Sequence, residues 1–167
     1  MNAAEEVVAG WLAAKGYFVM PSVKYGQKEI DLLAVKLAEN KSGLSEKLHV
    51  EVQVSPKPRH TNYEKDESYK AGAEKYFHDK FDALSPKVKE ILGEEFSRCF
   101  VVGKLGGGQR EENIDECRLR ELGVTTVRFD QVIREYAQSL TTQPEDNAGQ
   151  LLHLLSAFGM LNTAAEH

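Results

Sequence analysis

The sequence has few cysteines and no long apolar run. Cys99 and Cys117 lie 18 positions apart with no second pair, which fits neither a zinc-binding pattern nor a disulfide framework, so a reducing cytoplasm is the expected compartment. The N-terminal segment carries acids where an export signal needs bases. The most apolar stretch, residues 151–161, is too short to span a bilayer. We therefore expect a soluble cytoplasmic protein with no membrane association.

Positive charge is also scarce. The chain has 21 basic and 26 acidic residues, a net charge of −5, which excludes a protein that coats nucleic acid indiscriminately through its charge. A local site is not excluded. Residues 57–65, "KPRHTNYEK", hold Lys57, Arg59 and Lys65 against Glu64 alone. These three cations are the candidate nucleic-acid-binding residues.

The remaining composition and the pattern of apolar residues predict a folded α/β domain. Hydrophobic residues make up 41% and charged residues 28% of the chain, which argues against disorder. We expect residues 1–140 to form the α/β domain and 141–167 to be a linker and a C-terminal helix. The expected sheet is mixed, begins with an antiparallel three-strand meander, and is flanked by helices. The expected strands are 17–25, 29–37, 47–55, 98–105 and 124–129, and the expected helices are 3–15, 63–80, 86–92, 113–122, 130–140 and 150–161.

Two of the expected strands carry an acid among apolar residues. Asp31 lies in "EIDLLAV", and Glu51 lies in "HVEVQVS", where valines alternate with polar residues. Alone, Asp31 is explained by a salt bridge or an exposed strand end as well as by a functional site, and Glu51 is better explained by a half-exposed strand. Together, on neighbouring antiparallel strands, they can lie on one face, where two carboxylates suit a hard cation such as Mg²⁺ or Mn²⁺.

The series of elements resembles a known enzyme family. A helix with a glutamate, then "KGY", a strand, "EIDLLAV", a short loop and "HVEVQVS" resemble the core of the PD-(D/E)XK nuclease superfamily, in its restriction-endonuclease-like and Holliday-junction-resolvase-like forms. The resemblance implies a restriction-endonuclease-like core in which Asp31 and Glu51 bind Mg²⁺ or Mn²⁺, with the peptide carbonyl of Val52 completing the inner shell. It also implies a catalytic glutamate on the first helix, which is Glu5 or, as the alternative, Glu6.

One position departs from the family pattern. The family more often has a lysine two residues after the second acid, and this chain has Gln53. Glutamine can orient a water or a phosphate oxygen by hydrogen bonds, but it supplies no charge. Lys28, Lys57 or Lys70 could supply that charge from elsewhere. His49 is the one histidine on the strand face that holds the acids.

These features lead to one expected function and one alternative. The resemblance implies a Mg²⁺-dependent nuclease that hydrolyses the phosphodiester bonds of DNA, with Glu5, Asp31, Glu51 and Gln53 as catalytic residues. The alternative is a catalytically inactive nuclease-fold protein that binds nucleic acid or acts as an oligomerising interaction module. The apolar face of helix 150–161 packs either on a second subunit, giving a homodimer, or on its own core.

Overall fold

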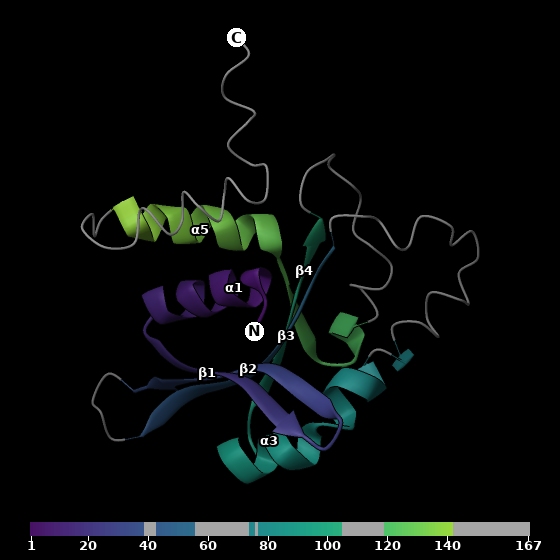
Figure 1. Cartoon of the computed structure of the whole chain (residues 1–167). Helices are drawn as coiled ribbons and strands as arrows, with labels where there is room; N and C mark the ends of the chain where they lie inside the picture. The colour runs from purple at the N-terminus through teal and green to yellow at the C-terminus, as the bar shows by residue number, and fades with distance from the viewer. Residues whose placement is uncertain (39–42, 56–73, 76, 105–118, 142–167) are drawn as a thin grey trace.

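The computed structural model describes residues 1–38, 43–55, 74–75, 77–104 and 119–141 (Figure 1). The helical elements include one π-helical turn, labelled η1. The elements in chain order are α1 (Ala3–Ala14), β1 (Tyr17–Tyr25), β2 (Lys28–Leu37), β3 (Leu44–Ser55), η1 (His78–Asp82), α3 (Ser85–Leu92), β4 (Ser97–Lys104), β5 (Val124–Arg128) and α5 (Phe129–Thr141).

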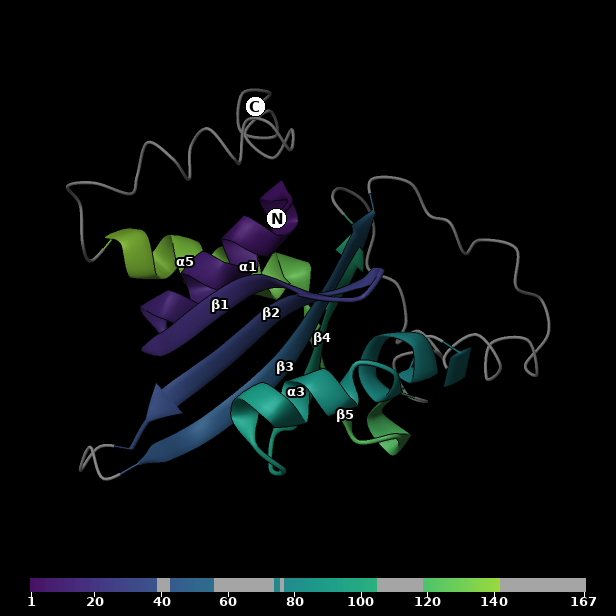
Figure 2. The same ribbon diagram turned by 60° about the horizontal axis from the view of Figure 1, so that its bottom comes forward.

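The strands form one mixed sheet in the order β1-β2-β3-β4-β5. The pairs β1–β2 and β2–β3 are antiparallel, and the pairs β3–β4 and β4–β5 are parallel. Helices α1 and α5 lie side by side on one face of the sheet, and α3 lies on the other (Figures 1 and 2). The expected α/β architecture with an antiparallel meander is therefore confirmed.

Helix α1 has clear start and stop signals. The Asn2 side chain accepts hydrogen bonds from the N–H groups of Ala4 and Glu5, and the Glu5 carboxylate accepts one from the Asn2 N–H, which forms a capping box. Gly16, with φ at 85°, follows the helix and turns the chain into β1. The apolar stripe of α1, including Val8 and Leu12, is buried.

The main core lies between the sheet and the pair α1 and α5. Strand β3 has the expected alternation, because Leu48, Val50, Val52 and Val54 all contact this core. The fully or nearly buried members of the core are Ala4, Val7, Val8, Trp11, Leu12, Leu32, Ala34, Val50, Cys99, Val101, Phe129, Val132 and Ile133.

The opposite face of the sheet is covered by α3 and η1. One cluster there joins β2 to α3, and a second joins η1 to β4, β5 and residue 119. This cover matters for the site, because His49 and Glu51 point to this face of β3 and are fully buried. The buried members are Ile30, Leu33, Leu84, Val88 and Leu92 in the first cluster, and Phe81, Phe100, Leu119 and Val124 in the second.

Pro21 in β1 predicts an edge position or a bulge, and the edge position is found. Strand β1 is at one end of the sheet order. The pairing with β2 is interrupted at Ser22, which has φ at 54°, and at Asp31 opposite it, and the register is the same on both sides of this gap, so no bulge is present. Proline has no N–H to donate to a ladder, which an edge strand tolerates because one of its sides is unpaired.

Several expected boundaries differ from the structure. Strand β3 begins at Leu44 rather than at 47, because Leu44 still pairs with Leu37. The end of the expected helix 63–80 is the π-helical turn η1, while 63–73 lie outside the described residues. Of the expected helix 113–122, only 119–122 are described, and 119–121 are helical.

The C-terminal prediction falls almost entirely outside the structure. Helix α5 continues to Thr141, one residue past the expected domain boundary, and the expected linker and helix from 142 onward lie outside the described residues. In the described part, no helix is long and apolar enough to cross a membrane.

Candidate functional site

The two acids lie where two strands separate. The pairing of β2 with β3 begins at Leu32–Val50, and Asp31 and Glu51 are the residues immediately beyond that pair. Strand β3 continues to pair with β4 as far as Ser55. The sheet therefore opens between β2 and β3 at the point where the acids occur, and their side chains can enter the opening.

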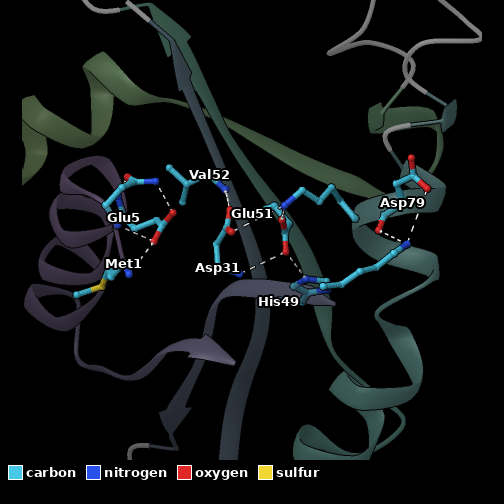
Figure 3. Close-up of polar contacts among 10 residues, drawn as sticks. Met1, Glu5, Asp31, His49, Glu51, Val52 and Asp79 are labelled. Carbon is cyan, nitrogen blue, oxygen red and sulfur yellow. Dashed lines mark hydrogen bonds and ion pairs between the residues drawn. The ribbon is translucent and has the colours of Figure 1, made fainter. Parts of the chain in front are cut away.

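Hydrogen bonds join the acids to the backbone of the neighbouring strand (Figure 3). Oδ2 of Asp31 accepts the N–H of Val52 at 2.8 Å, and Oε1 of Glu51 lies 3.5 Å from the backbone N of Asp31. The side chain of Glu51 is 0% exposed and that of Asp31 is 13% exposed. The expected proximity of the acids is therefore found, and both are largely removed from water.

A lysine that the sequence analysis missed supplies the charge for this pair. The ammonium of Lys80, on η1, lies 2.8 Å from Oε2 of Glu51 and 3.9 Å from Oδ1 of Asp31. Of the three lysines named from the sequence, Lys57 and Lys70 lie outside the described residues. The third, Lys28, donates to the backbone oxygen of Asp79 at 3.4 Å and does not contact the acids.

No signal in the sequence pointed to Lys80. It lies far along the chain from both acids, at no motif spacing, and its segment was expected to be the end of an ordinary helix. Lys28 has a different role in the structure, since it links the β1–β2 hairpin to η1. It thereby helps to hold the turn that carries Lys80.

Burial and neighbouring charges shift the pKa values of Asp31 and Lys80. Desolvation raises the pKa of Asp31 to about 6, and the neighbouring Glu51 carboxylate adds to the rise. Desolvation lowers the pKa of Lys80, but the carboxylates of Glu51 and Asp31 more than offset it, so that pKa lies above its ordinary value. The two acids together hold more negative charge than a single ammonium balances.

His49 contacts the second acid from the same strand. Its Nε2 lies 3.0 Å from Oε1 of Glu51, and its side chain is 0% exposed. The ring of Phe81 packs edge-on at 5.0 Å between centroids, and that of Phe96 lies at 6.5 Å. The position of His49 beside the acids, expected from strand alternation, is confirmed.

The two candidate glutamates of the first helix differ in burial. Glu5 is 7% exposed, while Glu6 is exposed. The carboxylate of Glu5 is engaged with Asn2 in the capping box, and its negative charge contributes to the raised pKa of Asp31. Glu5 is therefore the one near the site, and a catalytic role for it stays a prediction.

The remaining predicted site residues lie on β3 or outside the residues that the structure describes. Gln53 is exposed on the face of β3 that carries Glu51. The N–H of Val52 points to Asp31, and in a strand the N–H and C=O of one residue point to the same side, so the Val52 carbonyl faces the same opening. The nucleic-acid-binding candidates Lys57, Arg59 and Lys65 lie outside the described residues.

The donors present suit a hard cation with some ligands from water. Within the described ranges, no three His, Cys, Asp or Glu side chains are grouped to hold a metal ion. The available set is two carboxylates and one peptide carbonyl, all oxygen, which is the donor type that Mg²⁺ and Mn²⁺ prefer. Mg²⁺ usually keeps several waters, and the ammonium beside both acids shows that a cation fits there.

Comparison with known proteins places the chain in no family. It matches no protein-family model, and no curated protein and no solved structure is significantly similar to it.

Proposed function

We propose that this chain is a Mg²⁺- or Mn²⁺-dependent nuclease that hydrolyses phosphodiester bonds of DNA on a restriction-endonuclease-like core. The observation that carries the proposal is the cluster of Asp31, Glu51 and Lys80 at the opening between β2 and β3. Two acids on adjacent strands and a lysine are the groups that the family resemblance requires. In this proposal the lysine comes from η1 instead of β3, so position 53 can be a glutamine.

Each residue of the cluster has a distinct role in this proposal. Asp31, Glu51 and the Val52 carbonyl would hold the metal, which would supply an activated water and neutralise charge on the phosphate. Lys80 would stabilise the negative charge that grows on the phosphate oxygens in the transition state. Gln53, exposed beside them, would orient the attacking water by hydrogen bonding.

One observation favours the inactive alternative. The Lys80 ammonium already partly neutralises both acids without any metal. A decayed site could keep this arrangement as an internal ion pair, and the chain would then act only as a binding or oligomerising module. The two functions differ in one measurable property, which is whether the wild-type protein takes up a divalent ion.

The test combines metal binding with cleavage. We expect calorimetry to show Mn²⁺ binding by the wild type that Asp31→Asn and Glu51→Gln each abolish. With Mg²⁺ present, the wild type should nick or linearise plasmid DNA, and both variants should lose this activity. Glu90→Gln is the matched control, because Glu90 is an exposed acid on α3 that pairs with Lys87.

The controls also decide between the alternatives. Circular dichroism must show that each variant is folded. A wild type that binds no Mn²⁺ and cleaves neither linear, supercoiled nor branched DNA would rule out the nuclease and favour the inactive module. Cleavage that survives both substitutions would mean that the reaction takes place elsewhere.

A further inference from the structure

The burial of His49 at its position in β3 carries a cost in free energy. Its side chain has no exposed surface, the rings of Phe81 and Phe96 lie against it, and within the described residues its Nδ1 has no hydrogen-bond partner. A buried polar atom without a partner costs free energy, typically about 1–3 kcal/mol. An apolar side chain would fill this place without that cost. What it could not provide is the contact between Nε2 and Glu51.

The two carboxylate oxygens of Glu51 have different partners. An ionised carboxylate can only accept hydrogen bonds, so Nε2 of His49 carries the proton and donates it to Oε1. The backbone N–H of Asp31 approaches the same oxygen. The other oxygen, Oε2, faces Lys80 at 2.8 Å. One oxygen is thus held by His49 and the backbone of β2, and the other faces the ammonium of Lys80 on η1.

We propose that His49 is a positioning residue that fixes Oε1 of Glu51 and so reserves Oε2 for a cation. In the protein without metal, that cation is the Lys80 ammonium; its extension to a divalent ion rests on the proposed function. Residues that orient metal ligands in this way are nearly as important to a site as the ligands themselves.

The turn η1 holds the arrangement from the opposite side. Lys80 and Phe81 are consecutive residues of this turn. Lys80 reaches Oε2 of Glu51, while Phe81, which is 0% exposed, packs edge-on against the His49 ring. The aromatic contact restricts rotation of the imidazole and keeps Nε2 directed at Oε1. A single turn therefore locks the positioning residue and delivers the charged partner.

Two substitutions separate hydrogen bonding from packing. In His49→Gln the amide nitrogen can take the place of Nε2 and donate to Oε1. In His49→Met the side chain fills a similar volume and donates nothing. His78→Met is the control, because His78 is 73% exposed and its nearest acid is Asp79, not Asp31 or Glu51. Should His49→Met fail to fold, His49→Asn replaces it, since its shorter amide cannot reach Oε1.

The first measurement is a crystal structure of each variant without metal. We expect Glu51 to keep Oε2 on Lys80 in His49→Gln and to rotate away in His49→Met. An unchanged Glu51 carboxylate in His49→Met overturns the proposal, whatever the metal does.

The second measurement is calorimetry with Mn²⁺. We expect His49→Met to weaken binding about 10–100-fold, while His49→Gln and His78→Met stay close to the wild type. Rotation of Glu51 with unchanged affinity would overturn the extension to the metal. A wild type that binds no Mn²⁺ would overturn the nuclease proposal alone, because the crystal structures still decide what His49 does.

Discussion

Lys80 and a divalent ion cannot both lie between Asp31 and Glu51. The ammonium contacts Oε2 of Glu51 and lies within 4 Å of Asp31, so a metal bound by both acids has to move it. Displaced toward the opening, the ammonium would face a phosphate in place of the carboxylates. The same side chain would then oppose metal binding and assist cleavage.

This dual role predicts opposite effects of one substitution. Lys80→Met should tighten Mn²⁺ binding about five- to tenfold, because a partly exposed ion pair worth about 1 kcal/mol no longer has to be broken. It should also slow Mg²⁺-dependent DNA cleavage about 10²-fold or more. Calorimetry and plasmid cleavage measure the two effects.

The control for this prediction is Lys87→Met, which removes a lysine paired with Glu90 on α3 and should change neither property. Weaker Mn²⁺ binding by Lys80→Met would contradict the competition. It would mean that Lys80 helps the acids to hold a metal rather than excluding it.

At the scale of elements, the contact between α1 and α5 sets the position of the first helix against the sheet. Gly10 lies in the interior of α1, and a Cβ at this position would overlap the hydroxyl oxygen of Tyr136 on α5. Glycine in a helix is normally about 1 kcal/mol less favourable than alanine. Here its lack of a side chain allows the two helices to approach.

Gly10→Ala should therefore destabilise the protein in spite of its better helix propensity. We expect a loss of about 1–3 kcal/mol in the free energy of unfolding, the usual cost of overpacking. In a Tyr136→Ala background the same substitution should instead stabilise by about 1 kcal/mol. Urea unfolding of the four proteins of this double-mutant cycle tests it, and equal effects in both backgrounds would show that the ring moves aside freely.

At the scale of the whole molecule, Asp31 links global stability to pH. Its pKa is about 6 in the folded protein and 3.8 as the ordinary value, so between these limits the folded state holds more protons than the unfolded state. The free energy of unfolding contributed by this group therefore falls as the pH rises from about 4 to 6. The full cost, about 1–3 kcal/mol, is present above pH 6.

Asp31→Asn should remove this cost while keeping an oxygen that accepts the N–H of Val52. In EDTA, we expect the variant to melt about 3–8 °C above the wild type at pH 8. The difference should shrink to almost nothing at pH 4. Asp130→Asn, at a half-exposed residue paired with Arg128 and Arg134, is the control. A difference in melting temperature that does not depend on pH would show that Asp31 is not the cause.

The site combines features that differ in how far the sequence predicts them. The proximity of Asp31 and Glu51 was predictable, because side chains alternate along a strand and a short loop joins neighbouring strands in antiparallel order. Lys80 was not, because its approach depends on where η1 docks. The fold was predictable to the level of a mixed sheet with a meander, while the π-helical turn was not.

The sequence by itself determined which residues share a strand face, where the chain turns, and which acids are adjacent. Repeats of two and of about 3.6 residues follow from backbone geometry and hold in any tertiary context. Only the tertiary structure decided what covers each face. Burial of His49 and Glu51 and the contact with Lys80 arise because η1 packs over β3 while α3 covers the neighbouring β2. Packing of this kind depends on contacts between distant segments, which no local pattern encodes.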